Sequence, residues 1–303
     1  MNKMDLFVKF TPIVYLHSGE SYYPVEIKNY IKNSRLVKEE NEDVVMENIT
    51  DKNINELSKY DKKYYLELKT KEAREGDKGK QNYFYCFVNS GYDDFNGEFT
   101  DLTYVLCFSY NGTLSAHDFD TESITIRIDS EEKIKKIILS SHGKYFSYNP
   151  NEIEYEGNRP IIYSAYESHA FYPDPKTYRR MFNFGNDCCE RGVRLDDIQM
   201  IKLPEDPNLL PDNYEYLKFN GKRAKNFNER FPPLDRYKLN TTNFACPQHT
   251  LQKISGIYYD IYLYLFIALA ILVLINIRFR YNIISILIGA ILTLHMVFGL
   301  NNI

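Results

Sequence analysis

The chain has 303 residues, 44% of them hydrophobic and 15% aromatic, with 27 Tyr, 19 Phe and no Trp. This length allows one large domain or two small ones with a substantial core, and the many Tyr and Phe residues favour strands. The formal net charge is −4 and no basic stripe follows the chain, which argues against nucleic-acid binding through neutralised phosphates.

The N-terminal third of the chain predicts one helix and one long loop. Its start, MNKMDLFVKFTPIVYLHSGE, has no apolar segment and no small-residue cleavage site, so we expect no signal peptide there. Residues 24–36 predict a helix, because apolar side chains recur near helical spacing and Pro24 stands at the start, where a helix tolerates proline. Residues 71–81, KEAREGDKGKQ, predict a charged loop.

Two later runs alternate between apolar and other side chains with a period of two. The first run covers residues 102–109 and the second covers residues 124–128. Such alternation is expected of strands in a sheet with one buried face. Shorter runs at residues 135–140 and 160–165 predict further strands. We therefore expect a mainly β fold, a β-sandwich or jelly-roll-like soluble domain with a few helices.

Three histidines and two carboxylates lie beside these strand-like runs. Asp120 and Glu122 point to one face of a strand, so they can converge, whereas His117 joins them only if the chain bends. His142 and His169 stand at the ends of other runs. Imidazole and carboxylate ligands suit zinc or another first-row divalent ion, and the same groups serve as general acid and base. These five residues are the candidate catalytic and metal-binding residues, and a divalent metal is the candidate cofactor. The alternative is a set of ordinary polar side chains at strand ends.

The last hundred residues divide into a proline-rich connector and two apolar runs. Prolines crowd residues 204–256, which predicts an irregular connector. Residues 261–277 and 283–300 carry no charge, and each run is near the ~20 residues that cross a bilayer. Because the turn between the runs is short, residues 257–303 predict a transmembrane helical hairpin whose two ends face the same side.

Two features disagree about which side of the membrane the domain faces. Arg278 and Arg280 lie in the turn of the hairpin, which argues for a cytosolic turn. The domain would then have to cross the membrane without a signal peptide. We give the missing signal more weight and expect an integral membrane protein whose soluble domain faces the cytosol.

Six segments of the chain, taken in order, resemble the vacuolar protein sorting-associated protein 62 family. They are TPIVYLHSGESYYP, FTDLTYVLCFSYNGT, AHDFDTESITIRI, ILSSHGKY, NRPIIYSAYESHAFYPDP and FNFGNDCCERG. The resemblance covers residues 7–203 and implies a family domain at residues 1–203, to which the hairpin has been added. It matches the five candidate residues to the family's His, Asp and Glu positions, and it also matches His17, Glu20 and Asp187.

The chain departs from the family pattern at three places. The family has a His-x-Gly-Asp-Trp-Glu motif, and here Phe119 stands in place of its Gly and Thr121 in place of its Trp. Glu167 replaces the Gly that precedes Ser-His in a later family motif. The family name refers to delivery of proteins to the vacuole, and the resemblance implies no catalytic activity.

Three functions remain as hypotheses. The leading one is a membrane-anchored, cytosol-facing binding module in membrane trafficking or organisation, with the lipid bilayer and trafficking or membrane proteins as partners. The second is a metal-dependent hydrolase built on His117, Asp120, Glu122, His142 and His169. The third is a structural membrane protein of a large DNA virus, prompted by the Asn- and Ile-rich composition. Histidines that converge in space would favour the hydrolase, and scattered histidines would favour the binding module.

Overall fold

The structure is a computed structural model. It describes residues 3–93, 97–113, 116–179, 186–195, 198–204 and 209–225, together with residues 231, 267 and 271. Contacts divide the chain into two compact units, Met1–Thr177 with Asp187–Pro247, and Tyr178–Asn186 with Gln248–Ile303. The sheets that position the polar residues belong to the first unit.

A six-stranded sheet forms the centre of the first unit, in the order β16-β5-β6-β7-β8-β9. Its strands are β5 (Asn82–Asp93), β6 (Gly97–Asn111), β7 (His117–Asp129), β8 (Ile134–Ser141), β9 (Lys144–Tyr148) and β16 (Ile198–Lys202). Strands β5 to β9 pair antiparallel in sequence order, which is a meander and not the jelly-roll-like order we expected. The predicted strands at residues 102–109, 124–128 and 135–140 are confirmed within it.

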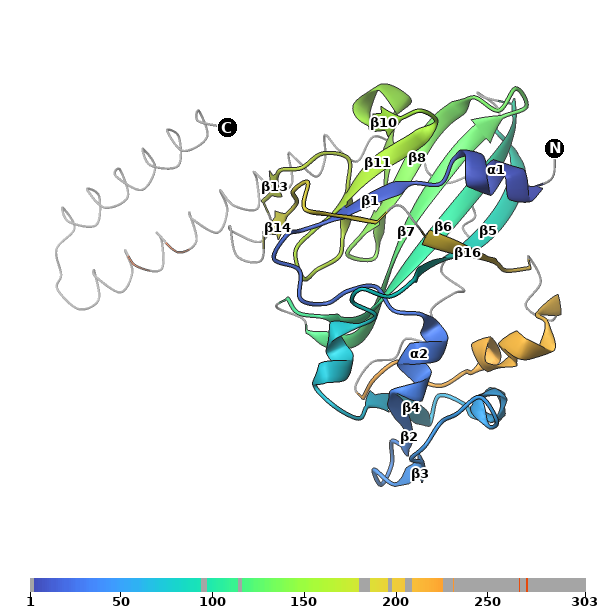
Figure 1. The fold of residues 1–303 in the computed structure, drawn as a ribbon, viewed down its shortest axis with the longest axis vertical. Helices are drawn as coiled ribbons and strands as arrows, with labels where there is room; N and C mark the ends of the chain where they lie inside the picture. Colours follow the sequence, from blue (N-terminus) through green and yellow to red (C-terminus); the bar gives the residue numbers. More distant parts are fainter. Residues whose placement is uncertain are drawn as a thin grey trace. The chain divides into compact units, whose positions relative to one another are not determined.

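A second sheet packs against one face of the six-stranded sheet, and the predicted mainly β fold is thereby confirmed. Its strands are β1 (Ile13–Leu16), β10 (Glu154–Glu156), β11 (Arg159–Ser164), β12 (Phe171–Tyr172) and β15 (Val193–Leu195). Apolar side chains of both sheets and of helix α1 (Lys3–Lys9) form one core, which includes Val14, Ile126 and Ile162. Figure 1 shows β1 and β11 lying across β7 and β8.

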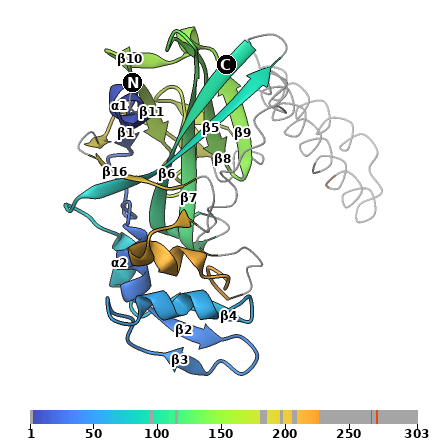
Figure 2. The same ribbon diagram turned by 90° about the vertical axis from the view of Figure 1, so that its right-hand side faces the viewer.

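A second core covers the opposite face of the six-stranded sheet. It contains side chains of helix α2 (Ile27–Lys32), of the three-stranded sheet β3-β2-β4, and of 3-10 helices. Figure 2 shows α2 and these three strands gathered at one end of β6 and β7. The remaining bounds are β2 (Ser34–Lys38), β3 (Val44–Met46), β4 (Tyr64–Leu68), η1 (Ile54–Lys59), η2 (Glu72–Glu75), η3 (Pro150–Glu152), η6 (Asp212–Lys218), β13 (Thr177–Tyr178) and β14 (Asp187–Cys188).

The expectation of one buried face in the central sheet is wrong. Thr103, Thr125 and Arg127 lie on the face away from the first core, yet each is at most 3% exposed. Their polar groups are paired inside the protein: the two threonine hydroxyls are 2.8 Å apart, and Arg127 binds Asp101 through two contacts of 2.9 and 3.0 Å. Because these partners satisfy the polar groups, polar alternation here does not mark a face in water.

The structure also differs in part from the predicted helix at residues 24–36 and from the predicted connector. The predicted helix at residues 24–36 is confirmed only as α2, because Ser34 begins strand β2. The described part of the predicted connector, residues 209–225, is packed and not loose: η6 buries Tyr216 and Leu217 in the second core. Pro211 directly precedes η6, so this proline does not keep the segment out of the core.

The predicted transmembrane hairpin at residues 261–277 and 283–300 lies outside the described residues, except for Ile267 and Ile271, which are helical. Within the described residues, no helix combines the length and the apolar character needed to cross a membrane.

Candidate functional site

Strand β7 bends at Phe119, and this bend assembles the polar residues. Phe119 has a φ of 58°, in the left-handed region. Its side chain is fully buried in the second core, where its ring lies 4.7 Å from that of Tyr30. A left-handed residue interrupts the two-residue alternation of a strand, and His117 Nε2 accordingly lies 3.8 Å from Asp120 Oδ1. The bend that His117 needed is therefore present, within the strand.

Asp120 is the centre of the first polar network. Its Oδ2 accepts a hydrogen bond from Asn111 Nδ2 at 2.8 Å and lies 3.4 Å from His169 Nδ1. Its Oδ1 accepts from the backbone N–H of Thr121 at 2.9 Å. Burial opposes ionisation of this carboxyl, but hydrogen bonds and charge from His117 and His169 outweigh it and hold the pKa of Asp120 well below its usual range. Asp120 is therefore a buried carboxylate.

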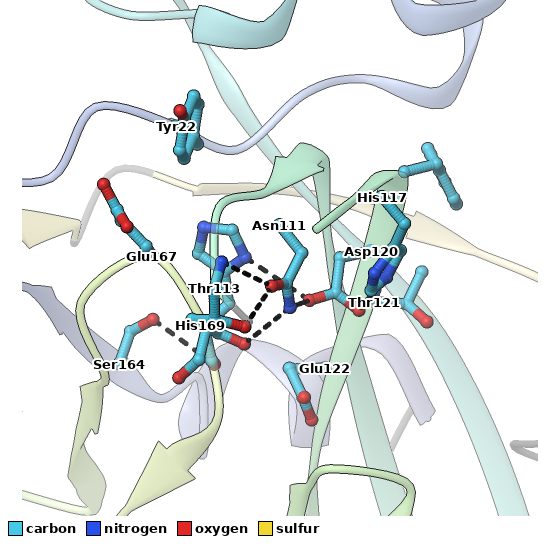
Figure 3. A network of polar contacts seen from close by, with 12 residues as sticks. Tyr22, Asn111, Thr113, His117, Asp120, Thr121, Glu122, Ser164, Glu167 and His169 are labelled. Carbon is cyan, nitrogen blue, oxygen red and sulfur yellow. Dashed lines mark hydrogen bonds and ion pairs between the residues drawn. The ribbon is translucent and has the colours of Figure 1, made fainter. Parts of the chain in front are cut away.

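Figure 3 shows His169 in the same polar network as Asp120 and Asn111. His169 is fully buried and lies between two carboxylates and an aromatic ring. Its ring stacks on Phe108, with centroids 3.8 Å apart and planes within 6°. Its Nε2 lies 3.8 Å from Glu20 Oε1. Burial alone would lower the pKa of His169, but the contacts with Asp120 and Glu20 raise it to about 9. The imidazole is therefore a buried cation at neutral pH, balanced by two carboxylates.

Glu20 is held by backbone donors. Its Oε1 accepts from the N–H groups of Ser21 at 3.0 Å and Tyr22 at 2.8 Å, and its Oε2 accepts from Glu167 N–H at 2.9 Å. Burial raises the pKa of this carboxyl, but the hydrogen bond and charge of His169 and these backbone donors leave the pKa lowered. Glu20 thus ties the segment before α2 to the turn between β11 and β12.

Glu122 lies two residues beyond Asp120 on β7 and has the opposite protonation state. It accepts a hydrogen bond from Ser140 of β8 and is 4% exposed. Burial, followed by the charge of Asp120, raises the pKa of Glu122 to about 8. At neutral pH the first network therefore stands next to a protonated carboxyl group.

Asp187 is the centre of a second polar network. His142 Nε2 lies 2.7 Å from its Oδ2, Tyr172 OH donates to Oδ2 at 2.6 Å, and Ser168 Oγ donates to Oδ1 at 2.7 Å. His142 occupies the turn between β8 and β9 with a φ of 52°. Ser168 also joins the two networks, because its carbonyl oxygen accepts from Asn111 Nδ2 at 3.3 Å.

The structure thus brings some of the five candidates together and separates others. His117 and His169 both approach Asp120, Glu122 is a neighbour bound to Ser140, and His142 belongs to the Asp187 network. Sequence reasoning missed Asn111 and Ser168, although both lie inside the motifs YNG and ESHAFYP that carry the resemblance. Within the described part of the chain, no group of three or more His, Cys, Asp or Glu side chains has an arrangement that could hold a metal ion.

Comparison with solved structures finds similar chains at low identity. The crystal structure of a necrosis and ethylene inducing protein 2, from the causal agent of cocoa's witches' broom disease, is 17% identical, covers 64% of this chain and 72% of its own, and has a TM-score of 0.33. A structure described as a toxin fold for microbial attack and plant defense is 13% identical, covers 79% and 90%, and has a TM-score of 0.42. The protein NLPPya in complex with glucosamine is 14% identical, covers 79% and 89%, and has a TM-score of 0.42.

Comparison with curated protein sequences finds no match. Comparison with family profiles finds the vacuolar protein sorting-associated protein 62 family, matched over residues 2–203. This match includes the segments that hold both polar networks, and it extends over about two thirds of the 303 residues. The chain therefore belongs to the vacuolar protein sorting-associated protein 62 family.

Proposed function

We propose that this chain is a membrane-anchored binding module, which acts in membrane trafficking or organisation by binding partner proteins from the cytosolic side. The observation that carries the proposal is the burial of the polar centre. Asp120, Glu122 and His169 are 8%, 4% and 0% exposed, and protein groups contact all three side chains. A general acid or base must reach its substrate directly or through one water, and these groups are enclosed by the protein.

The two networks act as a frame in this proposal. They join the ends of β6 and β7, the β8–β9 turn, the turn between β11 and β12, and strand β14. A frame of this kind fixes the surrounding loops, and loops on a rigid scaffold are where binding residues concentrate. Family membership agrees with a role that requires no catalysis.

The membrane anchor in the proposal rests on the sequence of residues 261–277 and 283–300. We expect the full chain to stay in the membrane fraction through an alkaline carbonate wash, because two uncharged runs near spanning length insert into the bilayer. Release of the full chain into the supernatant would contradict the anchor.

The cytosolic orientation is tested separately. Asn48, Asn111 and Asn240 begin Asn-x-Ser/Thr triplets, which are glycosylated only in the secretory lumen. In a eukaryotic cell the chain should show no mass shift on glycosidase treatment. Asn48 is the most informative of the three sites, because its exposed side chain is accessible to glycosylation, whereas Asn111 is buried in the Asp120 network. A shift mapped to Asn48 would place the domain in the lumen.

A hydrolase is the second candidate, and one observation favours it. The neighbouring carboxyl groups of Asp120 and Glu122 have pKa values displaced in opposite directions, and enzymes use such pairs as base and acid. The test is metal content and hydrolytic activity of the purified full chain and of its Asp120→Asn variant. A stoichiometric divalent metal, or an activity that disappears in the variant, would favour the hydrolase over the binding module.

A further inference from the structure

A cavity of about 210 Å³ lies beside the Asp120 network, between β4, η2 and the start of β7. Drug-sized ligands occupy pockets of about 300–1,000 Å³, so this cavity admits only a small molecule. Its wall includes four charged side chains, two of each sign, together with His117 and the rings of Tyr65 and Tyr110. The charged residues are Glu67, Arg74, Asp118 and Lys225.

Arg74 is held in the cavity wall, and part of its guanidinium makes no hydrogen bond to the described protein. The group stacks over the ring of Tyr110 at 4.2 Å, and its Nε lies 3.4 Å from Asp118 Oδ1. The backbone carbonyl of Arg74 accepts from Ser109 Oγ at 2.6 Å. In the described residues, neither terminal nitrogen of Arg74 donates a hydrogen bond. A held guanidinium with two free N–H edges matches a phosphate or carboxylate group.

Glu67 offers the complementary group on the same wall. Arg35 binds only its Oε2, through Nε and Nη2 at 2.7 Å each. The other oxygen, Oε1, accepts no hydrogen bond from the residues described, and the side chain is 39% exposed. Burial, together with the charge of Glu67, raises the pKa of Asp118, so this side of the cavity gains from an added positive charge. A primary amine supplies that charge and three N–H donors.

The charges of the wall decide between ligand classes. A simple anion would meet Glu67 and Asp118, and a simple cation would meet Arg74 and Lys225. We infer that this cavity binds a small zwitterion of the phosphoethanolamine type, with its phosphate on Arg74 and its amine on Glu67. The shared chemistry has two sources, a free phosphoethanolamine or the head group of phosphatidylethanolamine. Binding of this zwitterion would be a property beyond the proposed function, because it requires neither partner proteins nor the membrane anchor.

The first experiment is a calorimetric titration of the full chain in detergent with O-phosphoethanolamine, ethanolamine or inorganic phosphate. Phosphoethanolamine should bind at least about tenfold more tightly than either fragment, since only it engages both Arg74 and Glu67. Arg74→Gln and Glu67→Gln should each weaken it by about tenfold or more. Lys59→Gln, at a 72% exposed residue outside the cavity wall, should leave it unchanged.

Equal affinity for phosphate and phosphoethanolamine would overturn the inference, as would unchanged binding in both Arg74→Gln and Glu67→Gln. Because the titration needs no membrane, its failure would leave the membrane proposal standing, and release by carbonate would leave this inference standing.

The second experiment identifies the source of the group. The full chain is placed in bilayers of phosphatidylcholine, whose quaternary ammonium lacks N–H donors, or of phosphatidylethanolamine, and each is titrated with soluble phosphoethanolamine. Weaker apparent binding in phosphatidylethanolamine supports the inference with the lipid head group as ligand. Equal binding in both bilayers supports it with the free molecule as ligand. Absence of binding in both bilayers would overturn it.

Discussion

Residues 124–128 and residues 117–122 are two segments of the same strand, β7, and both are largely buried, but different interactions stabilise them. In the first segment Ile124, Ile126 and Ile128 enter the core between the two large sheets. In the second, the positions on that face are Asp120 and Glu122, which depend on partners from three other segments of the chain, β6, β8 and the turn before β12. Apolar contacts are non-directional, whereas a buried charge needs each of its partners in place.

This difference predicts how the two segments tolerate change. A conservative apolar substitution removes a few contacts and lets the neighbours relax. Removal of one member of a buried network leaves the remaining donors and charges without water or partner. We expect a larger loss of stability from a substitution in the polar segment than from one in the apolar segment, and each loss is measured on the full chain in detergent.

The Asp120→Ala substitution should have the largest effect. It leaves the His169 imidazolium with one carboxylate in place of two and leaves Asn111 Nδ2 without its acceptor at 2.8 Å. Breaking a buried ion pair on one side costs about 3–5 kcal/mol. Chemical denaturation should show a fall of that size in the free energy of unfolding. The matched control is Ile126→Val in the apolar segment, which should cost about 0.5–1.5 kcal/mol. Similar losses in both variants would remove the distinction between the segments.

Asp187→Ala should follow, with a loss of about 3 kcal/mol from unsatisfied donors. It removes the carboxylate that accepts from the hydroxyls of Tyr172 and Ser168, both of which are buried. Its effect on His142 should be smaller, because that side chain is 25% exposed and reaches water. If the two networks are coupled through Ser168, the Asp120→Ala, Asp187→Ala double variant will deviate from additivity by at least about 0.5 kcal/mol. Strict additivity would show two independent networks.

The pH dependence of stability tests the protonation states in the polar segment. Glu122 has a pKa of about 8 when folded and 4.5 as its ordinary value. Between these values the folded chain retains a proton that the unfolded chain has lost, so stability falls as pH rises. His169, with a raised folded pKa of about 9, acts in the same direction. Its contribution is complete below its ordinary pKa of 6.5 and is lost as pH rises through 9.

The free energy of unfolding should therefore decrease from pH 5 to pH 9, on the order of 1 kcal/mol per pH unit. Melting temperatures at pH 5, 7 and 9 give the check. Glu122→Gln, a neutral side chain that can still accept from Ser140, should flatten the profile between pH 5 and pH 7. An unaltered profile in this variant would mean that Glu122 is ionised in the folded chain at neutral pH.

Local patterns predicted the strands because alternation reports which side of a sheet a residue faces. Local patterns do not report what packs on each face of the sheet. The face with Arg127 and Thr125 was therefore expected to be in water, but it is buried. Pairing of Arg127 with Asp101 depends on the register of β6 against β7, which no local pattern contains. The sandwich-like packing of two sheets is likewise a long-range arrangement.

The candidate site was predicted in part for a similar reason. The positions of His117, Asp120 and His169 beside strand-like runs made them candidates, and the family resemblance matched them. Alternation alone nevertheless placed His117 on the wrong face, because the left-handed backbone at Phe119 is not visible in an aromatic residue. A Gly there, as in the family motif, would have indicated it. The role of Asn111 depends on contacts with both β7 and the turn before β12, and these contacts form only in the folded chain.

Glu167→Gly tests the smallest effect, the backbone strain around the polar segment. Glu167 has a φ of 56°, and the family motif has Gly at this position. A left-handed backbone costs a non-glycine residue about 1–3 kcal/mol, whereas glycine adopts it freely but loses about 0.5–1 kcal/mol of chain entropy on folding. The backbone N–H that donates to Glu20 is retained. Glu167→Gly should therefore raise stability by up to about 1 kcal/mol, read as a higher melting temperature.

The matched control for Glu167→Gly is Glu131→Gly, at an exposed turn residue outside the left-handed region. It relieves no strain and should lower stability by about 0.5–1 kcal/mol. At Phe119 the same exchange would not help, because the ring that packs against Tyr30 would be lost, and truncation of a buried Phe costs about 3–5 kcal/mol. Opposite signs for Glu167→Gly and Glu131→Gly would show that the backbone at residue 167, next to the polar network, is strained and that the backbone at residue 131 is not. Equal losses would show that the surrounding hydrogen bonds, and not the absence of a side chain, set the conformation at residue 167.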